Sequence, residues 1–256
     1  MVFLKFWRKR PDTESPRIEP ALWERVTAGL PFLRGLSDNE LSTLRDMTVA
    51  FLDEKEMTGA GGLELTDEMR LSIALQACLP VLNLGLEGYR GWVGIVVYPA
   101  GFIVDREIVD DDGVVHTYQE EVSGEAWDGG PVVLSWRDAS SGAYSGYNVV
   151  IHEFAHKLDM LNGEGEDWPR ARPGMDPKHW RRVFKTAFDR FVREVDAGEP
   201  TFIDPYAAEH PREFFAVMSE AFFTASAVLA RDWREFYEQL AAYYRQDPAG
   251  ILDVSQ

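Results

Sequence analysis

The residues best suited to chemistry form the pattern His-Glu-x-x-His, at His152, Glu153 and His156. Histidines four residues apart lie about one turn apart on the same face of a helix, so both imidazoles can reach one tetrahedral zinc ion. Glu153 stands beside the first histidine, where its carboxylate can take a proton from a water molecule that the metal activates. Apolar residues at 149–151 predict that this helix is buried behind the site. The pattern predicts a hydrolytic zinc site, and the competing interpretation is two histidines that cap or pack on a buried helix.

A hydrolytic zinc site needs a third protein ligand and one open position. The extended metzincin pattern would require glycine at 159 and histidine at 162, and the residues there are Asp159 and Asn162, which excludes that subclass. The remaining histidines are possible ligands, although each lies in a polar stretch that is typical of the surface: His116, His179 and His210.

A carboxylate from a downstream helix is the alternative third ligand. Glu213 and Glu220 are seven residues apart and therefore lie near the same face of one helix, predicted to begin at His210-Pro211. Each is surrounded by apolar and aromatic residues, where an acid without a partner is costly. A metal and its ligands would provide that partner. Only one of the two can be a direct ligand, and the other could orient a ligand histidine from behind.

The elements that must position these residues predict an α+β fold that is mostly helical, with a small mixed sheet. The first third is helical, with one helix starting at the capping box Ser37–Glu40 and another following Thr66 to about Leu84. A sheet is expected at about 91–136, from the β-rich runs 92–98, 102–104 and 131–136, with an acidic turn at 110–113. The part 146–247 is helical, with helices beginning near 148, 176 and 210 and a final helix over 228–245.

Composition and charge narrow the class of protein. The 256 residues include Lys+Arg 26 and Asp+Glu 43, a formal net charge of −17 that disfavours direct binding of nucleic acid. The single cysteine, Cys78, excludes an internal disulfide or a cysteine-built zinc site and favours a reducing cytoplasm. No run approaches the roughly 20 apolar residues of a membrane span.

We expect residues 1–20 to form a basic, proline-rich stub and connector, and residues 21–256 to form a single catalytic domain. Within 1–10 the apolar residues precede the charges, which is the reverse of the order in a signal peptide. The stub is then either a frayed terminus whose aromatic residues dock on the domain, or a weak anchor to a membrane or a partner.

Several motifs resemble the Mlc titration factor A family of zinc metallopeptidases. They are, in chain order, 79–86 (LPVLNLGL), 97–99 (VYP), 130–136 (GPVVLSW), 152–159 (HEFAHKLD), 204–208 (DPYAA) and 213–220 (EFFAVMSE). The resemblance covers most of the chain and is weakest before residue 20 and in 163–176. The arrangement is also similar to the catalytic domain of anthrax lethal factor, in which a tyrosine precedes the glutamate ligand at the separation of Tyr206 and Glu213.

The resemblance implies a zincin-like metallopeptidase with one zinc ion per chain, bound by His152, His156 and Glu213. It implies that Glu153 is the general base and then the general acid, and that the Tyr206 hydroxyl hydrogen-bonds the oxyanion of the tetrahedral intermediate. Glu220 is then either a residue that orients a ligand from behind or a surface charge.

The resemblance further implies aminopeptidase activity and a role in sugar uptake by the phosphotransferase system, through binding of a glucose-responsive transcriptional repressor. We expect a peptide or protein substrate that pairs with an exposed sheet edge at Val132–Trp136. Three acids could bind its free amino terminus: Glu125, Asp128 and Asp159. Two other functions stay open, namely a module that sequesters a regulator and uses zinc structurally, and a zinc hydrolase of a non-peptide amide. The negative charge suits a basic partner such as a DNA-binding protein.

Overall fold

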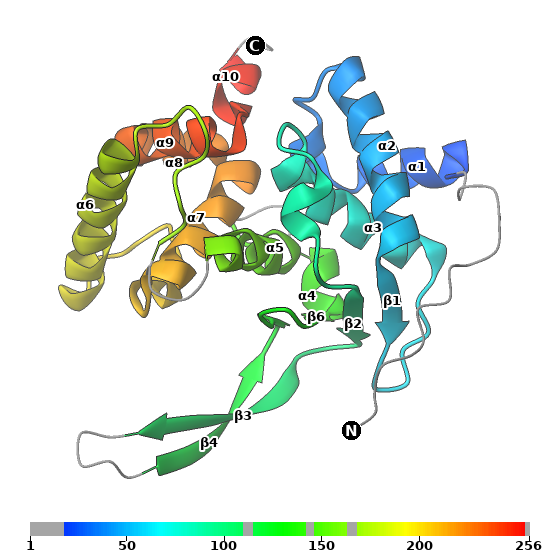
Figure 1. The fold of residues 1–256 in the computed structure, drawn as a ribbon, viewed down its shortest axis with the longest axis horizontal. Helices are drawn as coiled ribbons and strands as arrows, with labels where there is room; N and C mark the ends of the chain where they lie inside the picture. Colours follow the sequence, from blue (N-terminus) through cyan, green and yellow to red (C-terminus); the bar gives the residue numbers. More distant parts are fainter. Residues whose placement is uncertain (1–17, 110–114, 142–145, 163–167, 254–256) are drawn as a thin grey trace.

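The helix that carries the His-Glu-x-x-His pattern, α5 (Val149–Asp159), runs through the middle of the molecule between two groups of helices (Figure 1). The structure is a computed structural model, which describes residues 18–109, 115–141, 146–162 and 168–253. Residues 1–17 of the expected amino-terminal stub, the acidic turn at 110–113 and part of the loop 163–176 lie outside this description. The amino-terminal group contains α1 (Pro20–Ala28), α2 (Asp38–Glu54) and α3 (Asp67–Cys78). The carboxy-terminal group contains α6 (Pro177–Asp196), α7 (Pro211–Thr224), α8 (Ser226–Asp232), α9 (Arg234–Tyr244) and α10 (Pro248–Asp253).

The helices begin where the capping residues predict. Ser37 accepts a hydrogen bond from the backbone N–H of Glu40, whose carboxylate accepts one from the Ser37 N–H at 2.9 Å. This is the capping box expected for α2. The other predicted helix starts are also confirmed, with N-caps at Thr66, Asn148, Asp176 and His210.

Two predicted helices end differently from expectation. The helix after Thr66 ends at Cys78 and continues as a 3-10 turn, Leu79–Val81, because Pro80 has no N–H to donate to an α-helical hydrogen bond. The single helix expected over 228–245 is wrong, since α8 and α9 are separated at Trp233. The Trp233 ring is buried against Phe191, with ring centroids 6.1 Å apart, and its backbone is non-helical.

A small mixed sheet lies against α5 in the strand order β1-β2-β6-β5. The parallel strands are β1 (Glu56–Gly59), β2 (Gly94–Tyr98) and β6 (Val132–Ser135), and β5 (Gly124–Ala126) pairs antiparallel with β6. The expectation that Val132–Trp136 forms an exposed edge is therefore wrong. Strand β6 lies between β2 and β5, and all four of its residues are buried. It leads directly into the short helix α4 (Trp136–Ser141).

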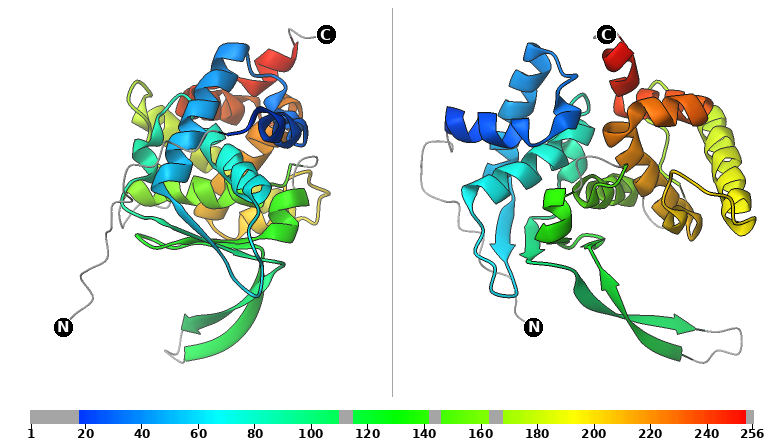
Figure 2. Two further views of the ribbon diagram at one scale, coloured as in Figure 1. Left: turned by 90° about the vertical axis from the view of Figure 1, so that its right-hand side faces the viewer. Right: turned by 180° about the vertical axis from the view of Figure 1, so that it is seen from behind.

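A long antiparallel hairpin projects from the body of the molecule on the side of the sheet (Figures 1 and 2). It consists of β3 (Phe102–Val109) and β4 (Val115–Val122), which pair from Phe102 with Val122 to Val109 with Val115. The strand expected at 102–104 is thus longer than predicted and pairs with a strand that the sequence analysis did not identify. Most of β4 is exposed, and its end leads straight into β5. We call the hairpin of β3 and β4 the arm.

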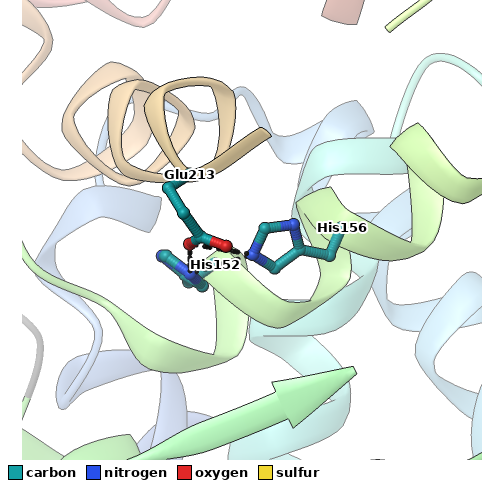
Figure 3. A group of neighbouring side chains, drawn as sticks. All are labelled: His152, His156 and Glu213. Atoms are coloured by element: carbon teal, nitrogen blue, oxygen red, sulfur yellow. Dashed lines mark hydrogen bonds and ion pairs between the residues drawn. The ribbon is translucent and has the colours of Figure 1, made fainter. Parts of the chain in front are cut away.

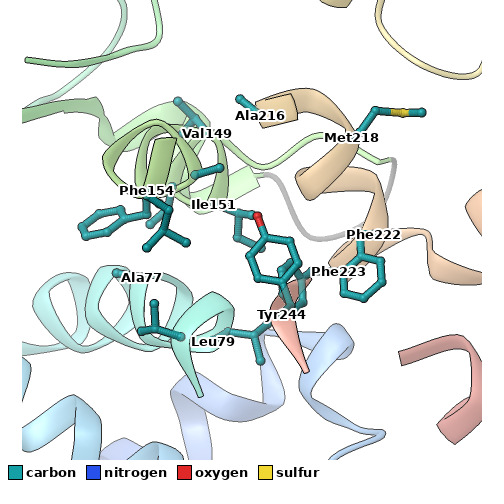
Figure 4. Packing of buried hydrophobic residues seen from close by; sticks show 14 of the residues in the cluster. Ala77, Leu79, Val149, Ile151, Phe154, Ala216, Met218, Phe222, Phe223 and Tyr244 are labelled. Carbon is teal, nitrogen blue, oxygen red and sulfur yellow. The ribbon is translucent and has the colours of Figure 1, made fainter. Parts of the chain in front are cut away.

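The hydrophobic core lies where α3, α5, α7 and α9 meet (Figure 4). Phe154 of α5 points towards α3, while Met218 and Phe222 come from α7 and Tyr244 from the end of α9. These four side chains are fully buried. Because α5 is packed from both sides, the polar residues on its remaining face are held at defined positions by a rigid element.

In the described ranges no single helix has both the length and the apolar content to cross a membrane. Helices α7 and α8 together have the required length and apolar content, but they are bent by 118° relative to one another. The apolar residues of α7, including Phe214 and Phe222, are buried in the protein core.

Candidate metal centre

The two histidines of α5 and a glutamate of α7 bring three donor atoms together (Figure 3). The Nε2 atoms of His152 and His156 are 3.1 Å apart, and Glu213 Oε2 lies 3.2 Å and 3.3 Å from them, respectively. The first pair comes from the i, i+4 spacing within one helix, and Glu213 comes from the first turn of α7. All three side chains are between 12% and 21% exposed, so the cluster is largely buried but open on one side.

The donor set fits a small tetrahedral cation. Zinc binds imidazole nitrogen and carboxylate oxygen at about 2.0–2.1 Å, so in a tetrahedron any two donors are separated by about 3.3 Å. The three separations found here, from 3.1 to 3.3 Å, match that value. A tetrahedral ion held by these three donors would keep one position for water or substrate.

Glu220 lies behind His152, on the side away from Glu213. Its Oε1 is 2.7 Å from His152 Nδ1, and its side chain is only 2% exposed. A proton on Nδ1 leaves the Nε2 lone pair free for a metal, so the carboxylate selects the tautomer that a ligand histidine needs. Glu220 is therefore buried and paired, and the interpretation of this residue as a surface charge is wrong.

Glu220 is part of a buried hydrogen-bond network at the start of α5. Its Oε2 accepts a hydrogen bond from the backbone N–H of Asn148, the N-cap of the helix. The Asn148 side chain accepts from Ile151 N at 2.9 Å and donates to Gln76 Oε1 at 2.7 Å. The network ties α3, α5 and α7 together at Asn148, the residue that starts α5. Gln76 was not singled out from the sequence, because a polar residue within an apolar helical run gives no indication of its distant partner.

Glu153 is buried beside the edge strand β5. It is 4% exposed and lies so close to Gly124 that a methyl group added there would be 2.4 Å from Glu153 Oε1. Only glycine allows this approach of the strand to the helix. Gly124 was missed in the sequence analysis, and a glycine next to a β-rich run is the signal that could have indicated it.

The charges of the cluster shift one another's pKa values. Burial alone would raise the pKa of Glu213, but hydrogen bonds from His152 and His156 outweigh burial and hold that pKa well below its ordinary value. Burial disfavours the charged form of His152, yet the charge of Glu220 and the two carboxylate contacts raise its pKa well above the ordinary value. Burial raises the pKa of Glu153, and the positive histidines only partly offset this effect. A raised pKa makes the Glu153 carboxylate a stronger base than an exposed glutamate.

Tyr206 lies in a 3-10 turn, Pro205–Ala208, at the rim of the cluster. Its ring centroid is 6.5 Å from that of His152, and its side chain is partly exposed. Burial, and then the neighbouring Glu213, raises the pKa of the Tyr206 hydroxyl above its ordinary value. The hydroxyl therefore stays protonated, as a hydrogen-bond donor must.

The cluster forms part of the wall of a cleft of about 820 Å³. One wall is formed by the base of the arm and β5, and the other by the segment 201–206 and α7. Carboxylates at the arm side give this cleft a negative lining: Glu120, Glu121 and Glu125.

The remaining sequence candidates lie in other surroundings. His116 is on the exposed arm, His179 Nδ1 contacts Arg182 at 2.9 Å, and His210 Nδ1 accepts from Arg212 N at 3.2 Å as the cap of α7. Among the acids considered for binding an amino terminus, Glu125 lines the cleft and accepts from Trp127 Nε1 at 2.6 Å. Asp159 is buried and pairs with Arg212 at 3.3 Å, whereas Asp128 lies in the exposed turn after β5.

A helix with two histidine donors, a carboxylate from a second helix and a buried glutamate beside a sheet edge together define a metallopeptidase type of site. The comparisons with known proteins agree with this class. The family described as glucose-regulated metallo-peptidase M90 matches residues 4–245. The chain is 40% identical over 245 residues to Mlc titration factor A of Klebsiella pneumoniae subsp. pneumoniae, covering 94% of this chain and 92% of that protein. It is 37% identical over 252 residues to the protein of the same name from Salmonella choleraesuis, with 97% and 94% covered. The chain belongs to the glucose-regulated metallopeptidase family M90.

Proposed function

We propose that this chain is a zinc-dependent peptidase, with the ligands His152, His156 and Glu213 and the general base Glu153. The observation that carries the proposal is the separation of the three donor atoms, 3.1–3.3 Å, next to a buried glutamate whose pKa is raised by burial. Both features are needed for hydrolysis and neither is needed for packing. A structural zinc site would be closed by four protein ligands, whereas the described residues supply three donors here and the set opens onto a cleft.

In this proposal each residue has a separate role in amide hydrolysis. A zinc ion held by this donor set would supply a Lewis acid for the scissile carbonyl and lower the pKa of water. Glu153 takes a proton from the attacking water and later delivers it to the leaving amine. Tyr206 donates a hydrogen bond to the oxyanion that develops on the carbonyl oxygen, an interaction that is stronger in the transition state than in the ground state. Glu220 holds His152 in place and in the required tautomer.

The substrate in this proposal is an extended peptide with a free amino terminus. Strand β5 pairs with β6 on one side, and its other edge is free to add a strand in the described part of the chain. Peptides add to such edges through main-chain hydrogen bonds. The acidic wall of the cleft favours a positively charged amino group, and Glu125, at the centre of β5, is the acid that we assign to it.

Regulation of a transcriptional repressor is the second part of the proposal. Its support is the name of the relatives, Mlc titration factor A, together with the charge of the arm. The strands of the arm, 102–109 and 115–122, contain four acidic residues and one basic residue, Arg106. A protruding acidic hairpin is complementary to a basic partner, such as a DNA-binding protein. A cytoplasmic location, favoured by the single cysteine, belongs to the same proposal.

The experiment that tests the peptidase compares wild type with Glu153→Gln, using zinc content and hydrolysis of peptide amides. We expect one zinc per chain in both proteins and a loss of about 100–10,000-fold in kcat for the variant, the range that general acid–base catalysis contributes. The control is Glu238→Gln, which changes an exposed glutamate of α9 outside the cleft and should keep kcat within about threefold. Zinc in both proteins without turnover of any peptide would favour the alternative, a module that sequesters a regulator and uses zinc structurally.

A further inference from the structure

Two buried lysines contact the same tryptophan ring, Trp92, from different elements. Lys157 Nζ lies 4.7 Å from the ring centroid and Lys55 Nζ lies 4.3 Å from it. Both residues are almost completely buried, at 3% and 6% exposure. Burying an ammonium group is costly unless its hydrogen bonds are satisfied, whereas methionine would fill the same space without that cost. Each lysine must therefore provide something that an apolar side chain of this size does not.

The hydrogen bonds of Lys157 connect the catalytic helix to the turn that follows the edge strand. Lys157 is the residue after His156, and its Nζ donates to the backbone oxygens of Trp127 at 2.5 Å and Gly130 at 2.8 Å. These two residues also close the β5–β6 turn, with Gly130 N donating to Trp127 O at 3.0 Å. The ammonium thus bridges both ends of the turn, and it does so from the helix that carries the metal ligands.

Strand β5 is short, and the two hydrogen bonds from Lys157 add to its pairing with β6 and to the backbone bond from Trp127 N to Pro131 O at 3.0 Å. It contains three residues and, among the described residues, pairs only with β6. The turn beyond it is exposed, and Trp127 itself is 53% exposed. At its other end β5 touches Glu153 through Gly124. A small displacement of β5 would therefore move the substrate-binding edge directly relative to the general base.

We infer that Lys157 is a positioning residue that fixes the edge strand β5 against the catalytic helix, and so sets where an extended peptide lies relative to Glu153 and the metal ligands. This inference rests on the proposed function for its catalytic consequence. The structural part of the inference, the connection between Lys157 and the strand, is independent of the proposed function. The proposal predicts that long peptides, which pair along β5, depend on Lys157 more than substrates too short to reach beyond the metal centre.

Lys55 provides a matched control. Its Nζ also donates to two backbone oxygens, those of Trp92 at 2.8 Å and Tyr89, and it pairs with Glu54 at 2.8 Å. These contacts hold the end of α2 to the segment 89–92, which is not part of the cleft wall. Lys55→Met and Lys157→Met thus each remove an ammonium group that lies over the Trp92 ring. Only the ammonium group of Lys157 is also bonded to the turn after the edge strand.

The test measures backbone amide exchange and two kinds of hydrolysis in wild type, Lys157→Met and Lys55→Met, after equal zinc content has been verified. We expect amides of residues 124–130 to exchange at least tenfold faster in Lys157→Met and within twofold of wild type in Lys55→Met. We expect kcat/KM for a pentapeptide to fall at least tenfold in Lys157→Met, while kcat/KM for a single-residue chromogenic anilide stays within threefold. If Lys157→Met does not fold, Lys157→Gln replaces it, with the same expectations.

Several outcomes would overturn the proposal or its catalytic part. Unchanged exchange of 124–130 in Lys157→Met would show that the lysine does not hold the strand, whether or not the protein is a peptidase. Faster exchange of 124–130 with equal losses of kcat/KM for the pentapeptide and the anilide would show a general structural role only. Equal effects of Lys157→Met and Lys55→Met on exchange and kcat/KM would show the same. A wild type without any peptidase activity would refute the proposed function and the catalytic consequence drawn here, while the exchange comparison would still decide the structural part.

Discussion

Replacing Glu220 tests whether the buried carboxylate behind His152 tunes the metal centre or merely caps α5. The two oxygens have different partners, since Oε1 faces His152 Nδ1 at 2.7 Å and Oε2 accepts from the backbone N–H of Asn148. In Glu220→Gln only one side-chain oxygen remains. Because both partners are donors when Nε2 of His152 binds a metal, one of them must then face an amide N–H. The substitution removes one of the two hydrogen bonds, and the negative charge that strengthens both, without changing the shape of the side chain.

The magnitude follows from the burial of this pair. A hydrogen bond to a charged group contributes about 1.5–3 kcal/mol, and Glu220 is 1% exposed, so solvent does not replace the lost partner. Loss of a group that orients a metal ligand typically lowers metal affinity by about 10–100-fold, or about 1.4–2.8 kcal/mol. The two ranges agree, so we expect the zinc Kd of Glu220→Gln to rise by 10–100-fold. At saturating zinc, part of the activity should return.

The assay is competition for zinc against a fluorescent chelator, with unfolding in urea measured on the same samples. The control is Ser219→Ala, the preceding residue on α7, whose buried hydroxyl donates to Phe215 O at 2.7 Å and contacts the Tyr244 hydroxyl. It should lose about 1 kcal/mol of stability and keep the zinc Kd within twofold. If Glu220→Gln also keeps the zinc Kd within twofold, the carboxylate acts only as part of the network that starts α5, and the reasoning about His152 is refuted.

Three further predictions concern separate parts of the structure. Gly124→Ala should lower kcat about 100-fold with zinc content unchanged, because its methyl group collides with Glu153. In the control Gly94→Ala the nearest neighbour of the added methyl group would be 3.5 Å away, and kcat should stay within about threefold of wild type. Equal kcat values for the two variants would contradict the close approach of Gly124 to Glu153. Tyr206→Phe should lower kcat/KM about 100-fold at unchanged zinc content, and full activity would exclude a role for the hydroxyl on the oxyanion. Burial raises the pKa of Tyr243 to about 12, so the unfolded chain ionises this residue first and the free energy of unfolding should fall between pH 10 and pH 12. Urea unfolding should show a shallower fall over this range for Tyr243→Phe, and parallel curves for the two proteins would rule out this source.

The metal ligands show where local sequence is sufficient and where it is not. Helical geometry alone places His152 and His156 on one face, and the structure has them there, 3.1 Å apart between Nε2 atoms. The third donor lies 57 residues further along the chain, and the residue pattern left Glu213, Glu220 and several histidines open. The resemblance to a family indicated Glu213, and the structure brings it into the cluster. No periodicity predicts which of two acids on one helix face meets a second helix, since that depends on how the helices pack.

The edge strand illustrates a different limit. The residues of Val132–Ser135 are almost all apolar, a pattern typical of a strand covered on both faces, and the structure places β6 inside the sheet rather than at the exposed edge that we expected. The exposed edge expected there belongs instead to β5, whose three residues are too few for any alternation to be detected. What distinguishes β5 is Gly124, which lets the backbone reach Glu153 because a side chain is missing. Gly124 has no reactive side chain, so residue types alone do not indicate its role. Yet a residue there larger than glycine would force apart the strand and the helix on which the proposed reaction depends.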